Sequence, residues 1–168
     1  ANTATDRTPS TPSTASTAGA PAASVAAPTG RSVSGDVSAS FLGPVDLTGM
    51  DGLFSAEEKA LALDVRAVVD ELIRPNIADW YEQAVFPREI VPELGRLGVL
   101  GMHLSGYGCA GRSAVQYGLA AQELEAGDSG LRTFVSVQGS LAMSAIHKHG
   151  SEAQKQQWLP AMAAGEAI

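Results

Sequence analysis

The chain has 168 residues, a formal net charge of −7 and a pI of about 4.8. This length is typical of one domain, and the acidic average disfavours nucleic acids and anionic membrane surfaces as partners. No apolar run approaches the roughly 20 residues that span a bilayer, and a single cysteine, Cys109, excludes an internal disulfide. We therefore expect a soluble protein that binds neither nucleic acid nor membrane.

The N-terminal segment differs in composition from the rest of the chain. Residues 1–40 contain no Leu, Ile, Met or aromatic residue and consist almost entirely of Ala, Ser, Thr, Pro and Gly. Such a segment buries too little apolar surface to offset the entropy lost on ordering. We predict a disordered tail over residues 1–44 and one folded domain over residues 45–168.

Targeting and chain ends allow two further expectations. Arg7 and Arg31 among many Ser and Thr residues are typical of organelle transit peptides, whereas Asp6 and Asp36 argue against one. The expected location is the cytoplasm if the protein is bacterial, with the mitochondrial matrix as the alternative. The chain begins at Ala1 without an initiator Met and ends at Gly165–Ile168 with an apolar last residue, which favours a piece of a longer protein.

The first predicted helix runs from Ser55 to Ile73. Ser55 and Glu58 have the spacing of a capping box, in which each side chain bonds the other's backbone amide. Pro75 ends or kinks the helix because it lacks an amide donor. The residues that form its apolar stripe recur three or four positions apart: Leu61, Val65, Val68, Val69 and Leu72.

Shorter elements follow. Residues 76–84 form a short helix or continue the first beyond a kink, and Pro87 suits the first turn of a helix over Arg88–Leu97. Val99–Leu104 is strand-like and leads into a glycine-rich loop over residues 106–111.

The C-terminal third of the chain contains further helix signals. A helix from Ser113 to Glu125 is predicted, with Val115, Leu119, Ala120 and Leu124 on its buried side. Asp128 or Ser129 caps a long helix to about His147. A second capping box, from Ser151 to Gln154, opens a last helix that buries Trp158, Leu159 and Met162. The pattern predicts an all-α protein, an up-and-down bundle of about five helices.

The glycine-rich loop matches the sequence of a nucleotide-binding pattern but lacks the structural context that the pattern requires. Gly106, Gly108 and Gly111 reproduce the G-x-G-x-x-G fingerprint, but a true fingerprint needs a second strand after its helix. The helix that starts near Ser113 leads directly into another helix, so a turn between helices is the preferred interpretation. Cys109 in this loop has neither a base nor a metal-ligand spacing beside it, which favours a packing role.

Other titratable residues fit structural roles. His147 and His149 are two positions apart and point to opposite sides of a helix, and His103 is distant in sequence, so we interpret all three as surface or capping residues. Glu123 and Glu125 are also two apart and cannot face one ligand together. We expect them on a solvated face.

Arg132 and Thr133 are the candidate site. Arg132 falls in the first turns of a helix, where a cation opposes the helix dipole and gains nothing locally. An arginine beside a helix N-terminus and a hydroxyl is, however, a good receptor for a carboxylate. On the residues alone, a surface arginine and an anion site both remain open.

Several blocks in order resemble the acyl-CoA dehydrogenase family, most closely its glutaryl-CoA dehydrogenases. They are Leu-Gly-Val-Leu-Gly from Leu97, Gly-Tyr-Gly-Cys-Ala-Gly from Gly106, Tyr-Gly-Leu-Ala-Ala-Gln-Glu-Leu-Glu from Tyr117, Asp-Ser-Gly from Asp128, Ser-Val-Gln-Gly-Ser from Ser136 and His-Gly-Ser-Glu from His149. The resemblance covers about residue 47 onward and implies the N-terminal helical domain of such an enzyme.

The resemblance also implies a function. In the full-length enzyme, FAD accepts a hydride from an acyl-CoA while a glutamate removes a proton, and glutaryl-CoA enzymes also decarboxylate the product to crotonyl-CoA. The family's carboxylate receptor matches Arg132, Thr133 and Glu125 as substrate-binding residues; Thr133 departs from the usual serine. No catalytic residue and no flavin-binding residue matches this chain, so the resemblance implies that the chain alone is inactive.

The same resemblance implies partners. These are the acyl-CoA substrate, an electron-transfer flavoprotein and, for the full-length enzyme, a homotetramer. Two alternatives remain: a non-catalytic helical interaction module, and part of a dehydrogenase for a monocarboxylic acyl-CoA.

Overall fold

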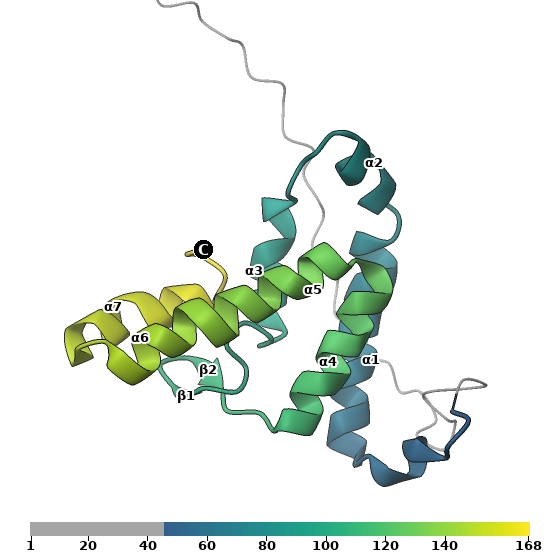
Figure 1. The fold of residues 1–168 in the computed structure, drawn as a ribbon, viewed down its shortest axis with the longest axis horizontal. Coiled ribbons are helices and arrows are strands. Elements are labelled where there is room, and N and C mark those ends of the chain that lie inside the picture. Colours follow the sequence, from purple (N-terminus) through teal and green to yellow (C-terminus); the bar gives the residue numbers. More distant parts are fainter. Residues whose placement is uncertain (1–45) are drawn as a thin grey trace, which may run out of the picture. The chain divides into compact units, whose positions relative to one another are not determined.

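The computed structural model describes residues 46–168, which form an almost wholly helical domain (Figure 1). The all-α prediction is confirmed. The predicted tail over residues 1–44 lies outside the described residues. Within residues 46–168, no helix combines the length and apolarity that crossing a bilayer requires.

The first helix agrees with its prediction. After a 3₁₀ turn at Met50–Leu53, α1 spans Ala56–Val68 and continues as a π-helix over Val69–Ile73. Ser55 Oγ accepts from the Glu58 amide, and the Glu58 carboxylate accepts from the Ser55 amide, so the predicted capping box is present.

Two short helices follow, and then a stretch where the prediction is wrong. Helix α2 spans Ile77–Glu82, and a 3₁₀ turn at Arg88–Ile90 leads into α3 over Val91–Arg96. Val99–Leu104, predicted as a strand, is a series of turns. Its apolar side chains are buried, but Gly98 and Gly101 adopt positive φ angles that an extended strand does not contain.

A small hairpin comes next. Strands β1 (Ser105–Gly106) and β2 (Cys109–Ala110) pair antiparallel, and the two residues between them, Tyr107 and Gly108, both have positive φ, as a type I′ turn requires. The glycine-rich loop is therefore a hairpin and not a phosphate-binding loop.

The remaining elements are helices. Helix α4 spans Ala114–Gly127, and α5 (Ser129–Ser136), a π-helix (Val137–Met143) and α6 (Ser144–His149) follow one another without a break. We call this continuous element the long helix. Helix α7 spans Glu152–Ala163. With the long helix counted once, the described residues contain six helices, close to the five predicted.

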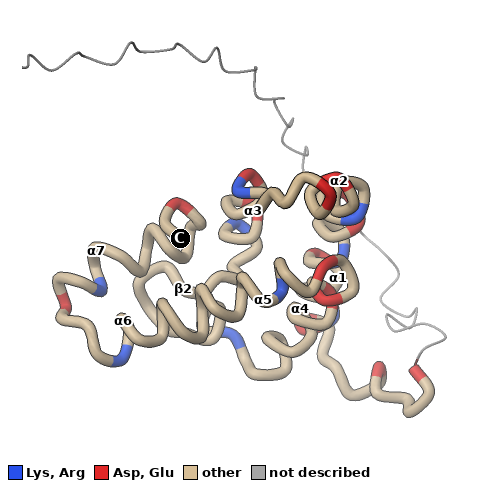
Figure 2. The backbone as a smooth tube through the Cα atoms, turned by 45° about the horizontal axis from the view of Figure 1, so that its top comes forward, with Lys and Arg blue, Asp and Glu red and all other residues tan. Residues whose placement is uncertain are grey.

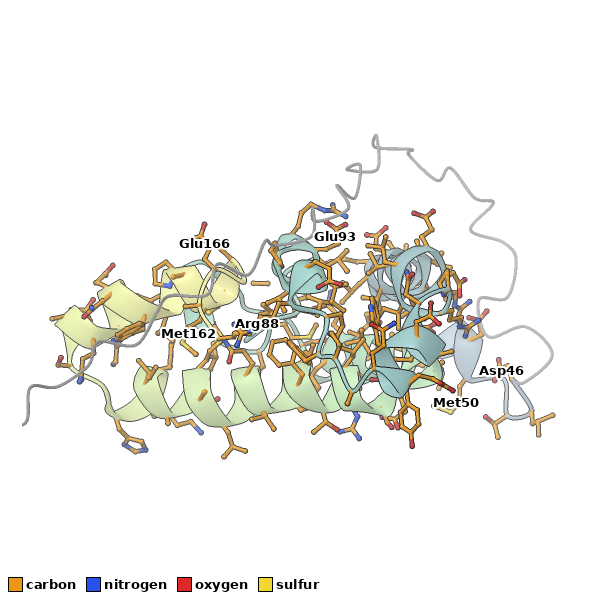
Figure 3. The ribbon with its side chains drawn as sticks, turned by 90° about the horizontal axis from the view of Figure 1, so that it is seen from above. Asp46, Met50, Arg88, Glu93, Met162 and Glu166 are labelled. Carbon is orange, nitrogen blue, oxygen red and sulfur yellow. The ribbon has the colours of Figure 1, made fainter. Side chains whose placement is uncertain are left out.

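Helix α1 packs mainly on α4, which is not its neighbour in sequence (Figure 1). The main core lies among α1, α3, α4, α5 and the turns at residues 99–102. A second cluster joins α7 to the far half of the long helix, and Figure 3 shows Met162 between these two helices. Two predicted core residues are instead exposed: Val115 and Trp158, each at 46%.

Gly139 brings the long helix against the turns before β1. A Cβ atom at residue 139 would lie 2.9 Å from the Gly101 amide nitrogen and 3.1 Å from its Cα. Only glycine permits so close an approach of two backbones. The contact places Met102 beside the first half of the long helix, where the candidate site lies.

Candidate functional site

A small pocket lies between α4 and the first half of the long helix. Its free volume is about 10 Å³, so it has room for a water molecule or the end group of a ligand and not for an acyl chain. Apolar side chains form most of the lining, with Arg132 at the rim: Met102, Tyr117, Ala120, Ala121, Leu124, Arg132, Val135 and Ser136.

Arg132 is held from one edge. The Asp128 side chain caps the long helix by accepting from the Leu131 amide at 2.7 Å, which places Arg132 at the fourth helical position. Its Nε donates to Glu125 Oε2 at 2.5 Å. Among residues 46–168, no acceptor occupies the Nη edge of the guanidinium, which is the edge that binds a carboxylate with two parallel hydrogen bonds.

The predicted site residues thus come from two elements. Glu125 lies near the end of α4, and Arg132 lies on the long helix, so the turn at Asp128 brings them together. Thr133 follows Arg132 and is exposed, but it does not line the pocket. It lies on the outer side of the long helix.

The outer side of the long helix is apolar beyond Thr133. Val137 and Leu141 follow at steps of four residues and are 49% and 67% exposed. Their exposure shows that these two side chains face away from the packed interior of the domain. No charged residue lies between Arg132 and Lys148, and the middle of the helix carries no charge in Figure 2. The surface therefore combines a cation at one end with a neutral, largely apolar face.

Three hydroxyl groups beside the pocket were not predicted. The Tyr117 hydroxyl on α4 lies 3.2 Å from Ser136 Oγ and 3.2 Å from Ser140 Oγ. The spacing of Arg132, Ser136 and Ser140, four residues apart on one helix, could have indicated the two serines. No local signal indicated Tyr117, because its partners are 19 and 23 residues away in sequence.

His103 supports Tyr117 from the side. Its Nε2 lies 3.0 Å from Ser144 Oγ, and its ring meets the Tyr117 ring edge-on at 5.7 Å between centroids. Partial burial, followed by the charges of Lys148 and His147, lowers the pKa of His103. Among the described residues, no three His, Cys, Asp or Glu side chains are grouped as a metal site requires.

Cys109 is half-buried in the hairpin, and burial raises the pKa of its thiol. A thiol with a raised pKa is a weak nucleophile at neutral pH. The packing interpretation is therefore the better one for this residue.

Glu123 corrects the prediction of a solvated acidic face. Only 5% of the residue is exposed, and its carboxylate receives Arg66 Nε and Nη2 from α1, each at 2.7 Å. These hydrogen bonds raise the pKa of Arg66. Glu125 remains exposed, as predicted. The two glutamates therefore point to different sides of α4, and only Glu125 faces the candidate site.

Comparisons with known proteins show the family to which the chain belongs. The family model described as acyl-CoA dehydrogenase, N-terminal domain, matches residues 55–166. A short-chain specific acyl-CoA dehydrogenase from Clostridium acetobutylicum is 33% identical over 120 residues, which cover 71% of this chain and 32% of that protein.

Two solved structures are closer in sequence. A glutaryl-CoA dehydrogenase from Mycobacterium smegmatis in complex with FADH2 is 57% identical with a TM-score of 0.72, covering 74% of this chain and 32% of that one. A second structure of glutaryl-CoA dehydrogenase from that organism is 62% identical with a TM-score of 0.70, covering 73% and 32%. The chain thus spans about a third of the length of these relatives. It belongs to the acyl-CoA dehydrogenase family, and residues 55–166 are its N-terminal domain.

Proposed function

We propose that this chain is the substrate-binding N-terminal part of a flavin-dependent glutaryl-CoA dehydrogenase, in which Arg132, Thr133 and Glu125 bind the distal carboxylate of glutaryl-CoA. The observation that carries the proposal is the geometry of Arg132. Glu125 holds its Nε and leaves the Nη edge open beside a pocket. The 57% and 62% identities to glutaryl-CoA dehydrogenases support the same substrate.

The outer side of the long helix suggests in which orientation the substrate binds. A dicarboxylic acyl chain has an anionic end and a short apolar body, and this surface offers Arg132 and Thr133 at one end and Val137 and Leu141 further along. The carboxylate would bind the guanidinium, while the methylene groups lie over the apolar side chains. Substrate binding would thereby orient the thioester away from Arg132.

The residues of this chain bind and orient the substrate in this proposal, and none is assigned to proton or hydride transfer. A bound flavin supplies the hydride acceptor in the family's reaction, and we assign no residue of this chain to holding it. Oxidation with decarboxylation to crotonyl-CoA, electron transfer to an electron-transfer flavoprotein and a tetrameric assembly belong to the full-length enzyme that we propose.

The principal alternative is a dehydrogenase for a monocarboxylic acyl-CoA. The 33% identity to a short-chain specific enzyme favours it, and Arg132 would then be a surface residue paired with Glu125. The two functions differ in what Arg132 contributes to discrimination between substrates.

Kinetics of the full-length, flavin-loaded protein with glutaryl-CoA and butyryl-CoA separate these functions. Arg132→Ala should lower kcat/KM for glutaryl-CoA by about 10-fold to 100-fold, because a charge-assisted bidentate contact is lost. The value for butyryl-CoA should change by less than about 3-fold.

Arg96→Ala is the matched control, because Arg96 on α3 also forms an exposed ion pair, with Glu93. It should leave both substrates unaffected. Equal losses for the two substrates in Arg132→Ala would contradict the assignment of the carboxylate receptor.

A further inference from the structure

Tyr117 connects α4 to the long helix through two serines. Its hydroxyl oxygen is 3.2 Å from Ser136 Oγ and 3.2 Å from Ser140 Oγ, so it bridges two consecutive turns. Tyr117 and Ser136 also line the pocket that has Arg132 at its rim. The hydroxyl network is therefore part of the pocket wall and not a remote structural contact.

The hydrogen bonds in this network have a direction. Tyr117 donates its single hydroxyl proton to Ser136 Oγ. The Tyr117 oxygen can then only accept from Ser140, so the chain of donors runs from Ser140 through Tyr117 to Ser136. Ser136 Oγ is thus an acceptor toward Tyr117, and its own proton remains free. Within residues 46–168, no other group takes that proton.

The position of Ser136 would allow its hydroxyl to donate this proton to an anion bound at Arg132. Ser136 lies four residues after Arg132 on the same helix, and both side chains line the same pocket. Glu125 already occupies the Nε of Arg132. An anionic group that binds the open Nη edge would therefore lie near the Ser136 hydroxyl. This hydroxyl already accepts from Tyr117 and can donate its own proton to the anion.

His103 holds Tyr117 in this orientation. Ser144 Oγ donates to the Gly139 carbonyl oxygen at 3.1 Å, so it has no proton left for His103. His103 Nε2 must then carry the proton and donate to Ser144 Oγ. This bond fixes the imidazole ring, whose edge-on contact in turn restricts the Tyr117 ring.

We infer that Tyr117 is a positioning residue that orients the Ser136 hydroxyl as a second donor for the ligand carboxylate at Arg132. The inference rests on the proposed function, because it assumes a carboxylate at Arg132. Without the Tyr117 hydroxyl, Ser136 could rotate and bond to a backbone carbonyl of the preceding turn, as helical serines commonly do. The donor would then be lost from the pocket although the serine is still present.

A matched pair of unreactive ligands tests the inference by equilibrium binding. S-(4-carboxybutyl)-CoA has the carboxylate of a glutaryl group, and S-pentyl-CoA has a methyl group in its place; both are thioethers without the activating carbonyl. Dissociation constants would be measured by isothermal titration calorimetry on the full-length, flavin-loaded protein. Tyr117→Phe should weaken binding of the carboxybutyl ligand by about 3-fold to 10-fold and change binding of the pentyl ligand by less than about 2-fold.

A double-mutant cycle shows whether Tyr117 acts through Ser136. Ser136→Ala should weaken the carboxybutyl ligand to a similar degree, and Tyr117→Phe should have no further effect in the Ser136→Ala background. Tyr107→Phe is the control, because it removes a hydroxyl bonded to Glu152 at a distance from the pocket, and it should leave both constants unchanged.

The outcomes separate this inference from the proposed function. If the wild-type protein binds both ligands equally and Arg132→Ala changes neither, the carboxylate site itself is wrong. If the wild type prefers the carboxybutyl ligand but Tyr117→Phe leaves that preference intact, only the role of Tyr117 is wrong. Equal weakening of both ligands, or independent effects of the two substitutions, would also overturn it.

Discussion

Helix α4 carries a glutamate paired with an arginine on each of two sides, and the two pairs differ in burial. On the side facing α1, Glu123 is almost fully buried and accepts two hydrogen bonds from Arg66. Two residues later Glu125 is exposed and accepts one from Arg132. The first pair joins two packed helices, and its carboxylate is shielded from ligands by burial. The second leaves one edge of its arginine open, so an ion pair indicates a binding site only where part of its donor set is unused.

The largest difference between the two sides should appear when each glutamate is removed. Glu123→Ala removes a buried carboxylate that accepts two hydrogen bonds from Arg66, and it should lower the free energy of unfolding by about 2 to 4 kcal/mol. Glu125→Ala removes an exposed pair and should cost less than about 0.5 kcal/mol. Urea denaturation followed by circular dichroism measures both. Similar losses for the two variants would show that the sides do not differ as described.

Two glycines of α4 give a smaller and independent comparison. A Cβ atom at Gly127 would lie 2.7 Å from Val69 Cγ1, whereas nothing lies within 4 Å of one at Gly118. Gly127→Ala should therefore destabilise the domain by about 1 to 3 kcal/mol through overpacking. Gly118→Ala should stabilise it by up to about 1 kcal/mol, because alanine loses less backbone entropy in a helix. Thermal unfolding of both variants is the measurement, and a stabilising Gly127→Ala would argue against close packing there.

The smallest expected change in the free energy of unfolding concerns the cap of the long helix, which lies next to the exposed pair of Glu125 and Arg132. Asp128 Oδ1 accepts from the Leu131 amide at 2.7 Å. Asp128→Ala should cost about 1 kcal/mol of unfolding free energy, and Asp128→Asn should be nearly neutral because asparagine caps equally well. A loss of the same size in both variants, measured by urea denaturation, would indicate that the charge matters and not the cap.

Local sequence signals predicted the helices well. The Ser55 and Ser151 capping boxes and the Asp128 cap are all present, because caps depend on residues three positions apart. The predictions failed where an apolar run had no clear period. Val99–Leu104 is buried like a strand but turns at Gly101, because the backbone of the long helix lies against it at Gly139.

The candidate site was predicted only in part, for a related reason. Arg132, Thr133 and Glu125 were identified from the resemblance to a family, and the helix-start position of Arg132 gave independent support. Tyr117 was missed because its two serines lie on another helix, and Glu123 was misplaced because its partner Arg66 is 57 residues away. Side chains that meet across helices leave no periodic trace in the sequence.

Sequence patterns were enough to predict the helical class and the ends of most helices, because these depend on neighbours within about one helical turn. The resemblance to a family indicated Arg132 as the cation that we propose to bind a carboxylate. Contacts between helices were needed to show which of the two glutamates is buried, which edge of Arg132 is open and which hydroxyl groups line the pocket. Those properties depend on contacts between α1, α4 and the long helix, whose strength is set by packing and burial across the chain.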